Sequence, residues 1–135
     1  MNATSKVLLY SDDRLVRGQV RVALGRKVAS DVPEVEIEEV ATPAAVIKAL
    51  ESATYDLCIF DGEATPAGGM GVAKQMKDEI PHCPPILLLV ARPQDAWLAT
   101  WSGAEAISPF PVDPVRLPAQ VAGLLRRAAV VDQRA

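Results

Sequence analysis

The sequence lacks the features that mark membrane, secreted and nucleic-acid-binding proteins. Its longest apolar run, Pro84 to Ala91, is far too short to span a bilayer. The polar segment Met1 to Lys6 has neither the charged start nor the long apolar core of a signal peptide. The net charge of −3, with both signs mixed along the chain, provides no basic field for a phosphate backbone. We therefore expect a cytoplasmic protein that binds neither nucleic acid nor membrane.

Cysteine and histidine are scarce, with two cysteines and one histidine in the chain. Cys58 lies in an apolar run and Cys83 in a proline-rich turn, which favours buried free thiols over a disulfide. His82 adjoins Cys83, but two neighbouring ligands do not make a zinc site. Hydrophobic residues, at 50%, are plentiful enough for one sizeable core. We expect a single domain over residues 1–135, with its core at about 6–127 and no room for an effector domain.

Short apolar runs are spaced along the chain as strands of a parallel sheet would be. The runs that are continuous, as strands covered on both faces should be, are Val7 to Tyr10, Leu57 to Phe60 and Ile86 to Val90. Glu34 to Glu38 alternates polar and apolar residues, which is typical of a half-covered position. We therefore predict three central strands and one edge strand among them.

Apolar residues recur at helical spacing between these runs. The series are Val16, Val20 and Leu24; Val46 and Leu50; Val72, Met76 and Ile80; and Leu117, Val121 and Leu125. Thr42-Pro43 and Asp113-Pro114 each offer a capping oxygen followed by a proline suited to a first helical turn. Pro118 implies that the last helix starts late or bends there. A βα unit repeated about five times predicts an α/β doubly wound parallel sheet, with functional residues at the carboxyl ends of the strands.

Carboxylates end two of the predicted strands. Ser11-Asp12-Asp13 follows the first strand, and Asp61-Gly62-Glu63 ends the third. Two carboxylates about 4 to 5 Å apart repel by about 3 to 4 kcal/mol at an effective dielectric near 20, and a divalent cation would relieve this repulsion. Oxygen ligands suit Mg²⁺. The alternative is that the acids after the first strand only cap a helix and that Asp61 only ends a strand.

Four stretches, in this order and spacing, resemble the receiver domain of bacterial response regulators. They are Lys-Val-Leu-Leu-Tyr-Ser-Asp-Asp-Arg-Leu-Val-Arg, Tyr-Asp-Leu-Cys-Ile-Phe-Asp, Pro-Pro-Ile-Leu-Leu-Leu-Val-Ala-Arg and Gly-Ala-Glu-Ala-Ile-Ser-Pro-Phe-Pro-Val-Asp-Pro. The resemblance runs from about Lys6 to Arg127. It implies a flavodoxin-like (βα)5 fold with strand order 2-1-3-4-5 and a role in two-component phosphorelay signalling.

The resemblance also implies a set of site residues. Asp61 falls on the aspartate that accepts the phosphoryl group, and Asp12 falls on an acid that ligates magnesium directly. Glu63 falls where a backbone carbonyl completes the metal site, and Asp13 is a further candidate ligand. Ser11 stands where the family usually has a second acid. The expected cofactor is therefore a weakly bound Mg²⁺.

Three further positions depart from the family pattern. Val90 stands in place of a threonine or serine, Phe110 in place of a lysine, and Ile107 in place of a switching aromatic residue. The missing lysine and hydroxyl contacts would contribute about 1.5 to 3 kcal/mol each, whereas moving an equilibrium from 1:99 to 99:1 takes about 5.5 kcal/mol. Pro111 is retained, which implies a cis Phe110–Pro111 bond. We expect phosphorylation at Asp61 to be lost or poorly coupled to conformation.

Two groups of residues are candidate partner surfaces. Arg14, Arg17 and Arg21 share one face of the first predicted helix, as a solvated face or as a surface that docks a phosphodonor. Trp97 and Trp101 lie one helical turn apart, which suits core packing of at least one ring or a binding hot spot. A hot spot would place the interface on the fourth helix, fifth strand and fifth helix.

The sequence predicts an atypical single-domain response regulator that acts through protein–protein interaction and is not an enzyme. Its partner would be a histidine kinase, another signalling protein or enzyme, or a second copy forming a homodimer through the fourth helix, fifth strand and fifth helix. One alternative is a working phosphorelay receiver that shuttles phosphate at Asp61. A small nucleotide- or flavin-binding enzyme on the same fold is the other, although the two carboxylates after the first strand would repel a phosphate group.

Overall fold

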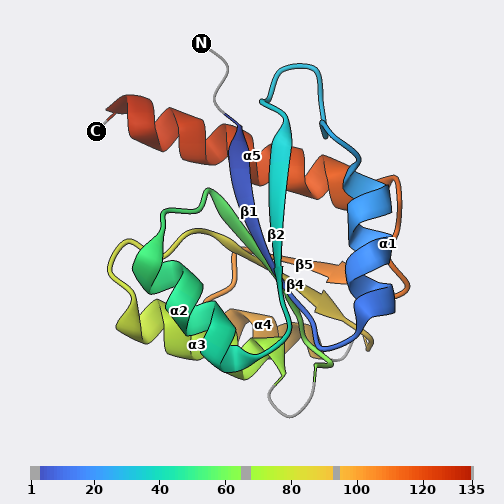
Figure 1. Ribbon diagram of the computed structural model, residues 1–135, viewed down its shortest axis with the longest axis vertical. Helices are drawn as coiled ribbons and strands as arrows, with labels where there is room; N and C mark the ends of the chain where they lie inside the picture. Colours follow the sequence, from blue (N-terminus) through green and yellow to red (C-terminus); the bar gives the residue numbers. More distant parts are fainter. Residues whose placement is uncertain (1–3, 65–67, 93–94, 135) are drawn as a thin grey trace.

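A single parallel sheet organises the computed structural model, which describes residues 4–64, 68–92 and 95–134 (Figure 1). Its order is β2-β1-β3-β4-β5, so the predicted strand order 2-1-3-4-5 is confirmed. The strands are β1 (Ser5–Tyr10), β2 (Val35–Val40), β3 (Leu57–Asp61), β4 (Ile86–Val90) and β5 (Ala106–Pro109). Every residue of β3 and β4 is buried, as their continuous apolar runs predict. The alternating segment forms the edge strand β2, two residues further along at its end than predicted.

Helices cover both faces of this sheet. They are α1 (Arg14–Leu24), α2 (Pro43–Ser52), α3 (Gly69–Glu79), α4 (Ala96–Ser102) and α5 (Arg116–Arg134). Figure 1 shows α1 and α5 on one face and α2, α3 and α4 on the other. Each face has its own core: Val20 and Val121 belong to the cluster under α1 and α5, whereas Val46 and Met76 belong to the cluster under α2 and α3. This is the doubly wound, flavodoxin-like arrangement.

Two predicted helix starts have different outcomes. Thr42 caps α2, because its Oγ1 accepts a hydrogen bond from the amide of Ala45 at 3.1 Å, and Pro43 is the first helical residue. The Asp113 carboxylate accepts hydrogen bonds from the amides of Val115 and Arg116. However, α5 begins only at Arg116, so the prediction that Pro114 lies in its first turn was wrong. The late start places Pro118 in the first turn, where its missing N–H loses no intrahelical bond.

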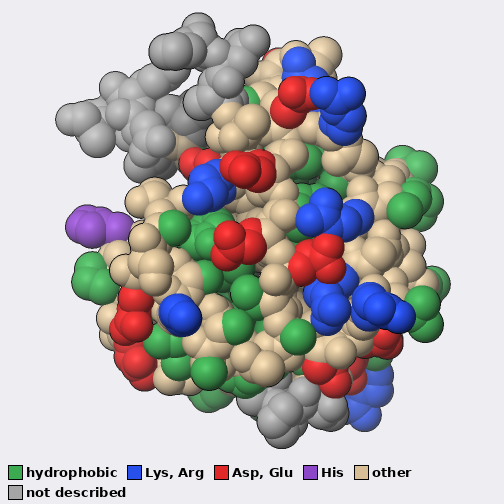
Figure 2. All heavy atoms as spheres, viewed as in Figure 1, with side chains coloured by type: hydrophobic (Ala, Val, Ile, Leu, Met, Phe, Trp, Pro, Cys, Tyr) green, Lys and Arg blue, Asp and Glu red, His purple; other side chains and the backbone are tan. Residues whose placement is uncertain are grey.

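The state of the two thiols and the distribution of surface charge agree with the expectations from the sequence. Cys58 and Cys83 are free; the first is buried and the second partly buried, and burial raises the pKa of both thiols. Acidic and basic side chains are interspersed on the face drawn in Figure 2, where β2 and α1 lie. Within the described ranges, no helix is long and apolar enough to cross a membrane.

Candidate functional site at the carboxyl ends of the strands

Asp61 is the buried acid at the carboxyl end of β3, with 3% of its surface exposed. Its Oδ2 accepts a hydrogen bond from the Ser11 hydroxyl at 2.7 Å, and its Oδ1 accepts one from the Glu63 amide at 2.8 Å. Ser11 follows β1, which pairs with β3 so that Tyr10 is opposite Phe60. The parallel register therefore brings these groups to one edge of the sheet, and both carboxylate oxygens have a donor.

Glycines allow the backbone to close tightly around Asp61. A Cβ atom on Gly62 would lie 2.6 Å from the Leu89 carbonyl oxygen, which the Gly62 amide approaches as a hydrogen-bond donor at 2.8 Å. A Cβ atom on Gly69, the first residue of α3, would lie 2.7 Å from the carbonyl oxygen of Asp61 itself. Side chains at these positions would force the chain apart. The start of α3 can pack against Asp61 because both residues are glycine.

The electrostatics of this edge make ionisation of Asp61 costly. Burial raises the pKa of its carboxyl group above the ordinary value, and the negative charges of Asp12 and Glu63 add to the rise. The hydrogen bonds from Ser11 and from the Glu63 amide act in the opposite direction, but the net shift is upward. The expected convergence of the acids of the first and third strands is thus present as a repulsive interaction between Asp12 and Asp61.

The Asp13 side chain is used in capping a helix. It is the N-cap of α1, where its Oδ1 accepts a hydrogen bond from the Leu15 amide at 2.8 Å. Its own amide donates to the Ser11 hydroxyl at 3.0 Å. Among the residues that the structure describes, no group of three or more His, Cys, Asp or Glu side chains could hold a metal ion. Two carboxylates and a carbonyl oxygen would suit Mg²⁺ only as a weakly held, largely hydrated ion.

Apolar side chains occupy the adjoining ends of β4 and β5. Val90 is buried in the cluster under α2 and α3, and Ile107 is partly buried against the same cluster. Phe110 packs against the cluster on the opposite face of the sheet, while its amide donates to the Val90 carbonyl at 3.0 Å. The Phe110–Pro111 bond is cis, as the resemblance implies. Neither Val90 nor Phe110 has a side-chain group that can donate a hydrogen bond.

A five-stranded doubly wound sheet with a buried aspartate at the end of β3 defines a receiver-type α/β domain. No protein-family profile matches the chain. Two proteins from strains of Mycobacterium tuberculosis, both called uncharacterized response regulatory proteins, are 52% identical over 124 residues, which cover 92% of this chain and 93% of theirs. The chain therefore belongs to the response regulator family. Membership makes it a signalling rather than a catalytic protein.

Solved structures support the fold. The receiver domain of a signal transduction histidine kinase from Syntrophus aciditrophicus matches with a TM-score of 0.76 at 20% identity, covering 92% of each chain. A two-component response regulator from Clostridium difficile matches with a TM-score of 0.76 at 21% identity, covering 92% of this chain and 98% of that one. At these identities the matches establish only the architecture, which is that of a receiver.

Trp97 and Trp101 lie on the outer face of α4. They are 67% and 54% exposed, so the interpretation that at least one ring packs in the core is wrong. The reason is that α4 is a helix of only 7 residues that packs against α3, and the two rings, spaced one turn apart, share the face turned to solvent. Exposed tryptophans are a frequent feature of binding surfaces.

The arginines of α1 do not form a common solvated face. Arg17 donates to the Ser11 carbonyl at 2.6 Å and to the Glu39 carboxylate at 2.9 Å. Arg21 also pairs with Glu39 and donates to the Ile37 carbonyl at 2.9 Å. These ion pairs lower the pKa of Glu39 and tie α1 to the edge strand β2. Arg14 and Arg21 are exposed, whereas Arg17 is only partly exposed and is held by its partners.

Sequence reasoning missed two features near this edge of the sheet. Arg92, just beyond β4, forms a two-point ion pair with Asp95; its signal was the i, i+3 spacing of opposite charges. Exposed aliphatic residues also lie on α1 and before α5, where Leu15 is 76%, Val22 84% and Val115 80% exposed. Figure 2 shows hydrophobic side chains at the margin of the molecule where α1 lies.

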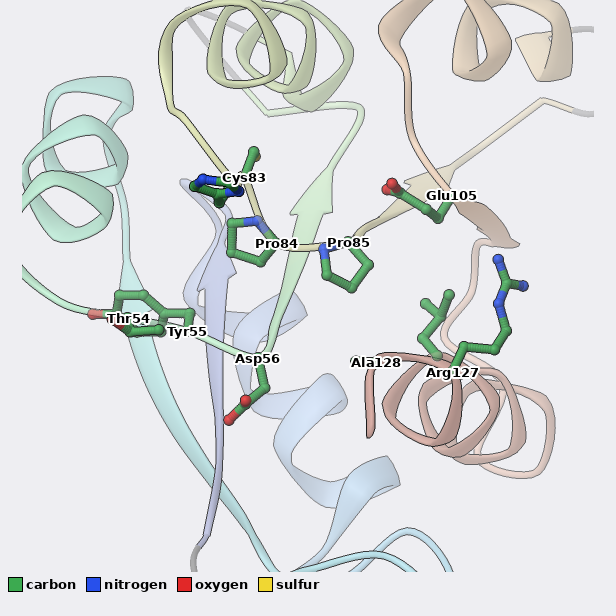
Figure 3. Close-up of a pocket in the computed structure, with 11 residues that line it drawn as sticks. Thr54, Tyr55, Asp56, Cys83, Pro84, Pro85, Glu105, Arg127 and Ala128 are labelled. Atoms are coloured by element: carbon green, nitrogen blue, oxygen red, sulfur yellow. The ribbon is translucent and has the colours of Figure 1, made fainter. Parts of the chain in front are cut away.

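A separate pocket of about 490 Å³ lies at the opposite, amino-terminal end of the sheet (Figure 3). The turns before β3 and β4 and the second half of α5 line it. Its acidic groups are used by the fold: Asp56 accepts a hydrogen bond from the Lys6 amide at 2.8 Å, and Glu105 pairs with Lys77 at 2.7 Å. The pocket is therefore remote from Asp61 and does not contribute to that site.

Proposed function

We propose that this protein is a stand-alone receiver that works by binding protein partners, with phosphorylation at Asp61 lost or poorly coupled to conformation. The observation that carries the proposal is the contrast around Asp61. Ser11 and the Glu63 amide already donate to its two carboxylate oxygens, while Val90 ends β4 and Phe110 directly follows β5.

The degenerate positions limit how strongly a phosphoryl group could shift the domain between two conformations. The lysine and hydroxyl that Phe110 and Val90 replace would each contribute about 1.5 to 3 kcal/mol through charge-assisted hydrogen bonds. A full switch requires about 5.5 kcal/mol of differential binding. Without both contacts, most of that difference is missing, and Ile107 cannot act as the switching aromatic residue. A phosphoryl group at Asp61 would then stabilise both conformations almost equally and would not shift the equilibrium between them.

The proposed metal site is correspondingly weak. Asp12, Asp61 and the backbone carbonyl of Glu63 supply its ligands, and Mg²⁺ would relieve the repulsion between the two carboxylates. Ser11 takes the place of a further acid and instead donates its hydroxyl hydrogen to Asp61. Mg²⁺ would have to compete with this hydrogen bond for the same carboxylate.

The proposed partner is a histidine kinase, another signalling protein or enzyme, or a second copy of the chain. The surface formed by α4, β5 and α5 is favoured by the exposure of Trp97 and Trp101. Large aromatic side chains dominate many protein interfaces because they bury much area with few rotatable bonds. The exposed aliphatic residues of α1 and of the segment before α5 offer a second surface, on the face of the sheet opposite to α4.

Incubation with a small-molecule phosphodonor and Mg²⁺, followed by intact mass measurement, tests the phosphorylation part of the proposal. We expect little or no mass increase in the wild-type protein, and the Asp61→Asn variant is the matched control. A large increase that disappears in this variant would favour the alternative, a working phosphorelay receiver. The observation in favour of that alternative is the negative charge of Asp12 close enough to Asp61 to raise its pKa.

Sedimentation of the wild type and of the Trp97→Ala/Trp101→Ala double variant tests the homodimer. A dimer formed through α4 should dissociate in the double variant, whereas the Val22→Ala control on α1 should sediment as the wild type does. If wild type and both variants are monomers, the partner is a different protein. A dimer lost only in the Val22→Ala control would assign self-association to α1.

A further inference from the structure

Arg92 and Asp95 form an ion pair between the end of β4 and the start of α4, and the two side chains differ in exposure. The Nε and Nη2 atoms of Arg92 donate to the two carboxylate oxygens of Asp95 at 3.1 and 3.0 Å. The Asp95 amide also donates to the Arg92 carbonyl at 3.0 Å. The Arg92 side chain is 65% exposed, whereas that of Asp95 is 12% exposed. The carboxylate is therefore fixed against the domain, and the guanidinium is the member that can move.

A chain of contacts leads from this pair to Asp61. The Glu63 amide donates to Asp61, and the Glu63 carboxylate accepts a hydrogen bond from the Ala91 amide at 3.4 Å. Pairing with Asp95 raises the pKa of Arg92, and the nearby charge of Glu63 adds to the rise. The guanidinium thus lies within electrostatic reach of an acid two residues beyond Asp61. It also follows Val90, the position where the site lacks a hydroxyl.

We infer that Arg92 is a ligand for an anionic group held at Asp61, and that it reaches this group by giving up its ion pair with Asp95. The inference rests on the proposed function, because it names the path by which any remaining response passes from Asp61 to α4. Release of Asp95 removes the side-chain contact between the segment after β4 and the residue before α4, and leaves only the backbone hydrogen bond between them. The exposed tryptophans of α4 lie directly beyond that point.

Exchange of partners suits Arg92 better than Arg17, an arginine of α1 that is held by two partners. Arg17 is 15% exposed, and the Ser11 carbonyl and Glu39 together hold its guanidinium. The ion pair of Arg92 is exposed on the arginine side, and such pairs contribute little to stability. A phosphoryl group carries more negative charge than a carboxylate. Its oxygens also match the geometry of the planar guanidinium group. The small difference between the two partners also explains why the response would be weak.

Binding of beryllofluoride in the presence of Mg²⁺ to the full chain, followed by backbone amide and arginine Nε–H NMR signals, tests this inference. The variants are Arg92→Gln and Asp95→Asn, with Arg26→Gln as the matched control. Arg26 is also an exposed arginine in an ion pair, with Glu34 at 3.2 Å. Arg92→Gln should weaken binding on the order of two- to fivefold, the effect of losing one exposed charge pair. Asp95→Asn should strengthen binding, because it frees Arg92, and Arg26→Gln should change nothing.

In the wild type, the Arg92 Nε–H signal and the amides of Asp95 and Ala96 should shift on binding, and the amide shifts should disappear in Arg92→Gln. Equal affinity in wild type and Arg92→Gln would overturn the inference. Weaker binding by Asp95→Asn would contradict the inference, because it would mean that the Arg92–Asp95 pair only supports the local structure. No binding by the wild type would overturn the inference while agreeing with lost phosphorylation. Broad shifts through β5, with the Arg92 effect intact, would contradict the proposed function alone.

Discussion

The sheet edge around Asp61 has a polar half and an apolar half. At the ends of β1 and β3, Ser11 and Asp61 are buried polar residues joined by a 2.7 Å hydrogen bond. At the ends of β4 and β5, Val90 and Phe110 belong to apolar clusters on the two faces of the sheet. The same backbone register connects the halves, because Asp61 pairs with Leu89 and Val90 pairs with Pro109.

The difference shows that one sheet edge of this receiver fold combines a polar half and an apolar half in the same backbone register. The polar half keeps a buried carboxylate whose pKa is raised by burial and by Asp12. The apolar half has the cis Phe110–Pro111 bond, and the Phe110 ring packs in the cluster under α1 and α5. In our proposal, the first half retains the group that could accept a phosphoryl group, and the second half has lost the groups that would respond to it.

Restoring donors to the apolar half should produce the largest effect. In a Val90→Thr/Phe110→Lys variant with Ser11→Asp added for the metal, two new contacts could contribute about 3 to 6 kcal/mol in total. This is comparable with the differential required for a full switch. Beryllofluoride and Mg²⁺ should then cause amide shifts across α4 and β5, whereas the wild type should shift only near Asp61, Arg92 and Asp95.

The matched control for this restoration is Ser11→Asp alone, which changes the metal site without restoring donors. If the control responds as broadly as the full variant, the metal rather than the phosphoryl contacts limits the switch. Phe110→Lys should cost about 2 to 3 kcal/mol of unfolding free energy, because it removes a partly buried ring from its cluster. Urea unfolding identifies variants that have lost the fold.

Ser11→Ala tests the hydrogen bond that defines the polar half. A buried hydrogen bond to a charged group contributes about 1.5 to 3 kcal/mol, so urea unfolding at neutral pH should show a loss of about 2 kcal/mol. Ser11 also lowers the pKa of Asp61, so the loss should shrink as pH falls and Asp61 becomes protonated.

Ser108→Ala is the control for this substitution, because Ser108 is 1% exposed and its hydroxyl has no hydrogen-bond partner among the described residues. Removing an unsatisfied buried hydroxyl should leave stability unchanged or raise it. Equal losses for Ser11→Ala and Ser108→Ala would mean that the bond to Asp61 adds nothing beyond the packing of a serine.

Asp61→Asn should raise the unfolding free energy at neutral pH by on the order of 1 kcal/mol, because it removes a buried charge that only hydrogen bonds compensate. The pKa of Asp61 is higher in the folded than in the unfolded chain, so the folded state binds more protons between the two values. Wild-type stability from this group therefore falls as pH rises through that interval, and the variant lacks this slope. Chemical unfolding between acidic and neutral pH measures both curves, and a less stable variant at neutral pH would show that the hydrogen bonds outweigh burial.

Much of the fold could be predicted because hydrophobic patterning is a local signal. The continuous runs of β3 and β4 report burial on both faces, and the alternation of β2 reports an edge position. Thr42 and Pro43 mark the start of α2 through local hydrogen bonding and a fixed φ angle. The late start of α5 was one of the two outcomes predicted from Pro118, whereas Asp113-Pro114 pointed to an earlier start because capping by Asp113 spans a turn that precedes the helix.

The site was less predictable because its energetics depend on long-range contacts. The sequence placed Asp12 and Asp61 at one edge, but it could not show that Ser11 donates to Asp61 across 50 positions of the chain. It could not show that α3 would pack against Asp61 at Gly69. The exposure of the tryptophans depended on which face of α4 meets α3, and helical spacing alone does not determine that.

The smallest expected effect concerns the stability contribution of Trp97 and Trp101, which follow the apolar half of the edge. Both rings are more than half exposed, so Trp97→Ala and Trp101→Ala should each change the unfolding free energy by less than about 0.5 kcal/mol, as surface substitutions usually do. Phe110→Ala is the contrast, because truncating a ring packed in a cluster should cost about 2 to 3 kcal/mol. Thermal and urea unfolding of the three variants under identical conditions measure the difference. A loss of 2 kcal/mol or more on truncating either tryptophan, judged against about 0.5 kcal/mol for surface sites, would mean that the ring packs within the molecule in solution and would remove it from the proposed interface.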